Sequence, residues 1–506
     1  MGLFIYTEIR PKHINQEEWN EVFNETKTLL NAYKFARINF DIYDGVKRHF
    51  LDGNCIEKAE DDYEKWKVSG DLESMRIAES FSLSNRLTDY SSKEYSDYDD
   101  ILMTQLFSKH DDVKNIFYSK TQGEPYHKYV LAIACLLESR FPKDIMVSGD
   151  ITKEQAIDAV NWANEYLKEE ITIPVRTDYK RLYDRLESVV DRHDLLDSVV
   201  KLKIDDDEEA LIELIKEKFS KEELESHLLK NLKSYKNICQ VGAQKIITSA
   251  FKMGYTLEDI INLLFIKNKD NKYDEEEFIK CIAKSDIFLN DDEKKILDFI
   301  TPKKNNVGSI NQTMFNMMLN MKLPIRHSNY HIDINDAVYI LKNKFSNVEN
   351  IDELINEGYA SAKEILSNLD DTISKAKEEY ELETADISVP ESMIYYENED
   401  TFAEHISMQL NSIIKFLIEN DMVNEVKERL SGNLKKEDYL KKLYSITSRK
   451  YAPPKERYYY LDNNMELEDI KKMIAFYLIE GGEFVSAVQK AILYNRQFCE
   501  YMLNKL

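Results

Sequence analysis

The segment from Tyr126 to Glu170, YHKYVLAIACLLESRFPKDIMVSGDITKEQAIDAVNWANEYLKEE, decides the fold class of the first part of the chain. Residues 126–141 form an apolar run long enough for a helix, and Pro142 ends it because proline cannot continue a helix. The short apolar run DIMVS (144–148) is typical of a buried strand.

A second helix is predicted directly after this strand. Gly149 and Asp150 supply a turn, and Thr152 with Gln155 forms a capping box at the start of the helix. Its apolar residues then recur on one helical face: Ala156, Val160, Ala163 and Leu167. A helix, a strand and a helix in this order predict an α+β domain with a small sheet.

Other stretches near the start of the chain also mix strand and helix patterns. GLFIYTEI (2–9) and ARINFDIY (36–43) predict strands, the second because Ile38, Phe40 and Ile42 alternate with polar residues. Residues 16–33 between them predict a helix. Weaker strand patterns occur at three places: ESFSLSN (79–85), ILMTQLF (101–107) and NIFYS (115–119).

From Val175 onward the pattern becomes helical. No proline occurs between Pro174 and Pro302, and no glycine between Gly149 and Gly242, so strand and turn signals are absent. Amphipathic segments are predicted at 178–202, 207–217, 220–236, 238–253, 257–266, 275–284, 292–300, 310–322, 334–346, 351–383, 400–430, 435–448, 466–480 and 483–505.

We therefore expect an N-terminal α+β domain followed by a large all-α region, arranged as a helical bundle or array. The expected boundaries are 1–175 for the α+β domain, 176–385 for a helical domain, 386–400 for a linker and 401–506 for a C-terminal helical subdomain.

The charge of the chain limits its partners. Its 506 residues include 68 Lys and Arg against 93 Asp and Glu, a formal net charge of −25. Such a charge repels phosphate backbones and anionic lipid and attracts basic proteins, so binding to nucleic acid or membrane is disfavoured. No apolar stretch approaches transmembrane length, and the first residues do not resemble a signal peptide.

The five cysteines indicate the compartment. They are widely separated, odd in number and form no CxxC pair, so neither a disulfide framework nor a zinc knuckle is predicted. A reducing compartment suits such thiols, and we expect a cytoplasmic protein.

The hexapeptide RHSNYH (326–331) resembles the Arg-x4-His signature of HEPN-type ribonucleases, which are small helical bundles. The resemblance implies that His331 acts as an acid or base and that Arg326 binds phosphate. A different interpretation follows from its neighbours. Pro324 ends one helix and Asp333 is placed to cap the next, so we predict a polar connector between helices.

Two places contain possible metal ligands. His327, His331 and Asp333 offer imidazole and carboxylate groups, but a structural zinc site needs a fourth ligand. Residues 263–282 are similar to an EF-hand, with Asn268, Asp270, Asp274 and Glu277 at ligand positions. Ile266 replaces the first carboxylate of that loop, and Asn271 replaces its hinge glycine. We therefore predict no metal and no cofactor.

The segment SRKYAPPKERYYYLD (448–462) interleaves basic and aromatic residues, a composition suited to gripping a partner surface. We favour a second interpretation, a long connector that Pro453 and Pro454 hold extended, with its tyrosines packed on neighbouring helices. The candidate partner-binding residues are Arg449, Lys450, Tyr451, Lys455, Arg457, Tyr458 and Tyr459.

The sequence contains no P-loop, no GxGxxG after a strand, no GxSxG elbow and no HExxH motif. The interpretation we prefer is a cytosolic, non-enzymatic interaction protein, for example an inhibitor or neutralising factor for a basic protein. Two alternatives stay open: a HEPN-like ribonuclease that uses Arg326 and His331, and a scaffold or subunit of a larger assembly. Nothing in the sequence fixes the oligomeric state.

Overall fold

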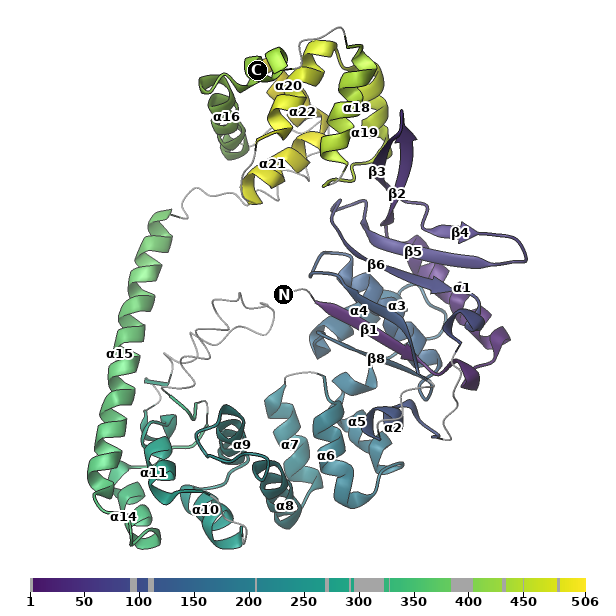
Figure 1. The fold of residues 1–506 in the computed structure, drawn as a ribbon. Helices are drawn as coiled ribbons and strands as arrows, with labels where there is room; N and C mark the ends of the chain where they lie inside the picture. The colour runs from purple at the N-terminus through teal and green to yellow at the C-terminus, as the bar shows by residue number, and fades with distance from the viewer. Residues whose placement is uncertain are drawn as a thin grey trace. The chain divides into compact units, whose positions relative to one another are not determined.

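The computed structural model in Figure 1 describes residues 3–91, 98–107, 113–204, 207–268, 273–290, 293–294, 323–326, 328–383, 404–429, 434–448, 450–479 and 483–506. They form two compact units. Val175–Leu382 make up the first, called here the helical unit. Gly2–Pro174 together with Glu383–Leu506 make up the second, called the mixed unit.

The predicted fold class is confirmed, because small antiparallel sheets occur in the N-terminal part and helices dominate the described residues that follow. The domain boundaries stay a prediction. The linker expected at 386–400 and the helix expected at 310–322 lie outside the described residues, as does most of the helix expected at 292–300.

The strands of the mixed unit form two antiparallel sheets. One has the order β7-β1-β8. The other has the order β3-β2-β5-β4, and β6 pairs with β5. The bounds are β1 Phe4–Ile9, β2 Phe35–Tyr43, β3 Val46–Asp52, β4 Ile56–Lys58, β5 Glu64–Asp71, β6 Ile77–Ser84, β7 Lys114–Lys120 and β8 Ile145–Gly149. The sequence patterns predicted β1, β2, β6, β7 and β8 but missed the other three.

The helices α1 (Gln16–Ala32), α3 (His127–Arg140) and α4 (Lys153–Asn164) confirm the predictions for this region. The capping box is present: Gln155 N donates to Thr152 Oγ1 at 3.2 Å, and Thr152 N donates to Gln155 Oε1 at 3.0 Å. These two bonds satisfy backbone donors that the first turn of α4 leaves free.

Helix α3 packs against α1, α4 and β8, so it is buried on all sides from Val130 to Leu137. This explains why its sequence is apolar all round rather than amphipathic. The one acidic residue of α3, Glu138, is also buried, and its Oε2 accepts a hydrogen bond of 2.6 Å from Val147 N. A carboxylate on the helix thereby supports the adjacent strand.

One strand prediction is wrong. Residues 101–107 contain helix α2 (Ile101–Leu106) rather than a strand. The Asp100 side chain accepts a hydrogen bond of 2.8 Å from Leu102 N and so caps the helix start. Aspartate at this position favours helix initiation, a local signal that the apolar pattern alone does not reveal.

The helical unit follows the predicted helices closely. The segment 178–202 is the exception, because it contains two helices separated at Ser188–Asp191. The described helices are α5 Tyr179–Glu187, α6 Arg192–Leu202, α7 Glu208–Lys218, α8 Lys221–Leu232, α9 Val241–Lys252, α10 Leu257–Ile261, α11 Glu275–Ala283, α14 Ile334–Lys344 and α15 Ile351–Glu383. A π-helical turn, Asn262–Lys267, follows α10.

The C-terminal part of the mixed unit contains α16 Glu404–Glu419, α17 Met422–Arg429, α18 Lys436–Thr447, α19 Lys455–Asn464, α20 Leu467–Tyr477, α21 Glu483–Tyr494 and α22 Arg496–Lys505. The segments predicted as single helices at 400–430 and 483–505 each contain two. The connector expected at 448–462 is wrong from Lys455 onward, because α19 begins there, directly after Pro454. Proline suits this position because the first helical turn needs no donor from it.

The hairpin formed by β2 and β3 packs on these C-terminal helices. Phe50 and Leu51 of β3 belong to the same buried apolar cluster as residues of α18 to α22. Leu51 N donates to Pro453 O at 3.0 Å, and Tyr458 Oη donates to His49 O at 3.0 Å. Segments from opposite ends of the sequence therefore share one core.

Arg48 of β3 lies at the centre of this contact. Its Nε and Nη2 donate to the two carboxylate oxygens of Asp41, both at 2.8 Å, and its Nη1 donates to Asp462 at 2.9 Å. The guanidinium carbon also lies 4.7–4.9 Å from the ring centroids of Tyr43, Tyr444 and Tyr458. Two carboxylates and three aromatic faces compensate the charge of this buried side chain.

The alternation predicted for β2 is present, but its apolar face is not the covered one. Phe40 and Ile42 are 51% and 61% exposed. The helices instead contact the opposite face of the hairpin, where Asp41 binds Arg48 and Tyr43 packs on the shared core. The predicted period of two is therefore present, and the covered face is the one that carries Asp41 and Tyr43.

We predict that Arg48→Ala lowers the free energy of unfolding by about 2–4 kcal/mol, because it leaves Asp41 and Asp462 without their cation and removes three ring contacts. Urea denaturation followed by circular dichroism measures the change. Arg429→Ala is the matched control: its side chain is 74% exposed and, among the described residues, pairs with Glu425 of the same helix, so we expect a change within about 0.5 kcal/mol. Equal effects of the two substitutions would contradict the role assigned to Arg48.

Candidate functional site

The connector predicted around RHSNYH is present in the described residues. Arg326 and His331 both lie outside helices, and α14 begins after them. Asp333 caps α14 as predicted, since Asn335 N donates to its Oδ1 at 2.8 Å. His331 is exposed, and its Nδ1 lies 3.2 Å from Leu289 O. His327 lies outside the described residues.

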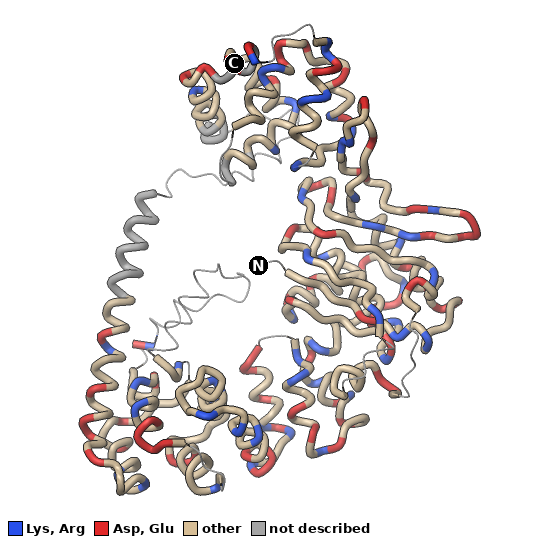
Figure 2. Tube along the Cα trace, in the orientation of Figure 1, with Lys and Arg blue, Asp and Glu red and all other residues tan. Residues whose placement is uncertain are grey.

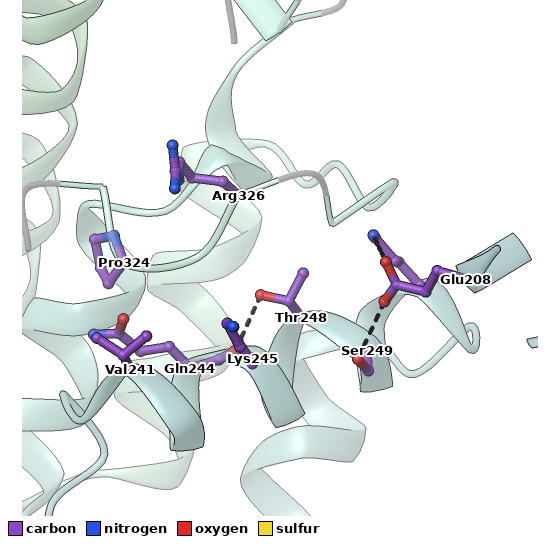
Figure 3. Close-up of a pocket in the computed structure, with 9 residues that line it drawn as sticks. Glu208, Val241, Gln244, Lys245, Thr248, Ser249, Pro324 and Arg326 are labelled. Atoms are coloured by element: carbon purple, nitrogen blue, oxygen red, sulfur yellow. Dashed lines mark hydrogen bonds and ion pairs between the residues drawn. The ribbon is translucent and has the colours of Figure 1, made fainter. Parts of the chain in front are cut away.

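Arg326 nevertheless lines a cavity of about 340 Å³, called here the basic cavity (Figure 3). This space lies between α9 and the segment that carries Pro324. Its lining residues come from α7, α9 and the connector: Glu208, Val241, Gln244, Lys245, Thr248, Ser249, Lys252, Pro324 and Arg326. Arg326 therefore lines this cavity together with two lysines and two hydroxyl side chains.

One carboxylate, that of Glu208, lies among the cations that line the basic cavity. Lys252 Nζ lies 2.5 Å from Glu208 Oε2, and Ser249 Oγ donates to Glu208 Oε1 at 3.3 Å. The Glu208 carboxylate therefore contacts both side chains, at the right of Figure 3. Burial lowers the pKa of the Arg326 guanidinium, and the nearby Asp286 carboxylate opposes this effect. The side chains that line this cavity carry three positive charges and one negative charge, and Asp286 offsets part of the positive charge from outside the lining.

The floor of the basic cavity includes a buried amide. Gln244 is 4% exposed, and its Nε2 donates to Cys239 O at 2.7 Å. Its Oε1 has no hydrogen-bond partner among the described residues. A buried acceptor without a partner is costly, so this oxygen favours a ligand or water that can donate to it.

A second, larger cavity of about 620 Å³ lies among α6, α7, α8 and α9, and we call it the apolar cavity. Leucine, isoleucine, valine and methionine side chains from these helices form much of its wall. The residues are Leu196, Val200, Leu211, Ile212, Ile215, Leu224, Leu228, Ile246 and Met253. Glu208, Lys245 and Ser249 line this cavity and the basic cavity alike.

A groove of opposite charge, called here the acidic groove, occupies about 710 Å³ where α11 and α15 begin. Six carboxylates line it: Asp274, Glu275, Glu276, Glu349, Glu353 and Glu357. None of the described residues that line it is Lys or Arg. Figure 2 shows red segments at the start of α11 and along the first turns of α15.

The EF-hand-like positions do not converge on a metal site within the described residues. Asp274 caps α11, accepting a hydrogen bond of 2.8 Å from Glu277 N. Asp270 lies outside the described residues. More generally, the described part of the chain contains no group of three or more His, Cys, Asp or Glu side chains placed to hold a metal ion.

The candidate partner-binding residues of 448–462 separate into two sets. Tyr451, Arg457 and Tyr458 are 8%, 5% and 1% exposed, and the Arg457 Nε donates to Leu493 O at 2.8 Å inside the C-terminal core. The exposed set is Lys450, Lys455 and Tyr459. Arg449 lies outside the described residues. Partner binding stays a prediction, and the exposed set is the part that a partner can reach.

Sequence reasoning missed the cavity residues Lys245, Thr248 and Lys252. All three lie on α9, where the sequence shows only the period of an amphipathic helix. Their convergence with Arg326 depends on how α9 meets a segment many residues later, and no local pattern encodes that.

Comparisons with protein-family models, with curated proteins and with solved structures find no match. No helix within the described residues combines the length and apolar character that crossing a bilayer requires.

Two thiols of the helical unit interact. Cys239 is exposed and Cys281 is buried. A hydrogen bond from the Cys281 thiol lowers the pKa of Cys239 to about 7, against the opposing effect of partial burial. The thiolate of Cys239 is the reactive form, so its reactivity rises as pH increases through this value.

We predict that alkylation of Cys239 by iodoacetamide reaches half its maximal rate near pH 7, because the thiolate forms there. Mass spectrometry of the labelled peptide measures the rate at each pH. In Cys281→Ala, which lacks the hydrogen-bond donor, the midpoint should rise toward the ordinary thiol value of about 8.5. A midpoint that is the same in both proteins would show that Cys281 does not stabilise the thiolate.

Proposed function

We propose that this chain is a cytoplasmic, non-enzymatic interaction protein whose acidic groove binds a basic segment of a protein partner. An inhibitor or neutralising factor for a basic protein would act in this way. The observation that supports the proposal best is the groove itself, since six carboxylates line one concave surface without a lysine or arginine among its described lining residues.

The charge of the whole chain supports the same partner chemistry. A formal net charge of −25 raises the encounter rate with a basic partner at long range, and the groove then supplies local complementarity. The cytoplasmic placement rests on the five cysteines, all of which are free thiols.

Carboxylates of the groove come from two helices, which suits an extended segment better than a point charge. Glu353 and Glu357 are exposed and lie one helical turn apart on α15, and Glu275 and Glu276 face the groove from the first turn of α11. A peptide with several lysine or arginine residues can contact carboxylates from both helices at once. Such contacts are exposed to solvent, so added salt should weaken them.

We predict that a fluorescein-labelled peptide of alternating lysine and glycine binds the protein, and that Glu353→Gln/Glu357→Gln weakens binding by about three- to tenfold. The lost free energy corresponds to two solvent-exposed charge contacts. Fluorescence anisotropy at low and at physiological salt measures the dissociation constant.

The matched control is Glu209→Gln/Glu213→Gln on α7, which removes two exposed carboxylates with the same spacing away from the groove. We expect this control to change the dissociation constant by less than twofold. Equal weakening by the two double variants would mean that net charge alone governs binding, and absence of binding to the wild-type protein would contradict the proposal.

A further inference from the structure

The basic cavity and the apolar cavity adjoin each other along helix α9. Lys245 and Ser249 of α9 and Glu208 of α7 line both spaces. One cavity is cationic and the other is walled largely by aliphatic side chains. A ligand that occupied both would need a charged end and an apolar end.

The apolar cavity has the properties of a ligand site. Its volume of about 620 Å³ lies in the range of about 300–1,000 Å³ that is usual for small-molecule pockets. Val200 of α6, Ile212 of α7, Ile246 of α9 and Met253 directly after α9 line it, and each is only half-buried. Covering this surface with an apolar chain would remove aliphatic groups from water, which is favourable.

The rim of the apolar cavity is polar and includes Lys203, Asn231 and His227. His227 hydrogen bonds through Nδ1 to Asp197, a carboxylate that also pairs with Lys230. This carboxylate is therefore already paired with Lys230 and does not present an uncompensated negative charge to the opening.

The basic cavity supplies the complementary end. Lys245 comes from α9 and Arg326 from the connector, so two cations from separate elements flank one space (Figure 3). Lys252 adds a third cation, which Glu208 offsets. The buried Gln244 Oε1, without a partner among the described residues, can accept a hydrogen bond from the hydroxyl of a monoprotonated phosphate monoester but not from a carboxylate. A positive cavity in a chain of net charge −25 is a local exception to the overall field.

We propose that helices α6–α9 bind a free single-chain amphiphile with an oxyanion head group, a carboxylate or a phosphate monoester. The apolar chain lies among α6, α7, α8 and α9, and the head group lies between Lys245 and Arg326. This site is separate from the acidic groove, and its occupancy does not depend on whether that groove binds a basic partner.

Isothermal titration calorimetry of the full chain tests the proposal with four probes: dodecanoate, dodecyl phosphate, dodecanol and inorganic phosphate. We expect at least one of the two charged amphiphiles to bind with one-to-one stoichiometry, at least tenfold more tightly than both dodecanol and inorganic phosphate. Which charged probe binds better identifies the head group. Equal affinity for dodecanol, or for inorganic phosphate alone, would overturn the amphipathic site.

Two single variants separate the ends of the site. Lys245→Ala should weaken binding of the charged amphiphile by about tenfold and leave dodecanol unaffected, since a charge-assisted contact is lost. Ile212→Asn should weaken both charged and neutral amphiphiles, because it places an amide in the apolar wall. Lys236→Ala is the control: it removes an exposed lysine that lines neither cavity and should change binding less than twofold.

Thermal unfolding of each variant confirms that it is folded before titration. If Lys245→Ala and Lys236→Ala weakened binding of the charged amphiphile equally, the placement of the head group beside Lys245 would be wrong. Sedimentation with phosphatidylglycerol vesicles gives the remaining arm. Protein that binds vesicles but neither free charged amphiphile would assign the lysines to a membrane surface and refute the enclosed site.

Discussion

The guanidinium of Arg48 holds together segments that lie 414 residues apart in the sequence. It binds Asp41 on its own hairpin and Asp462 on α19, with aromatic rings from β2, α18 and α19 against its faces. Burying an uncompensated cation is costly, so this geometry is stable only when both ends of the chain supply their carboxylates. The mixed unit depends on that constraint, because the hairpin and the C-terminal helices complete one apolar core around it.

The sequence predicted helices and strands better than it predicted which segments pack against each other. Helices and strands with a strong period, and caps such as Thr152 with Gln155 and Asp333, were identified because their signals lie within a few residues. Helix α2 was mistaken for a strand because a short apolar run fits both periods, and only Asp100 distinguishes them. The exposed Phe40 and Ile42 show a different limit: alternation defines two faces, but the face that is covered depends on distant helices.

The candidate sites show the same division between local and distant information. The spacing of Arg326 from His331 resembles a nuclease motif, yet Arg326 lines a cavity with Lys245 and Lys252 of α9 and not with His331. Tyr458 and Arg457 looked like surface residues for gripping a partner, and both are buried in the C-terminal core. In the helical unit, cavities of opposite charge form where helices from separate stretches meet. The composition predicts the net charge of the chain, but it does not predict which cavities are acidic and which are basic.

We infer that the β2–β3 hairpin and the C-terminal helices form one cooperative structure through Arg48. Hydrogen–deuterium exchange of the full chain, followed by mass spectrometry, tests this most directly when the native protein is compared with Arg48→Ala. We expect the amides of Val46–Asp52 and Lys455–Asn464 to lose protection together in the variant, while those of α3 (His127–Arg140) keep theirs. Faster exchange in only one of the two segments, or in neither, would contradict this inference.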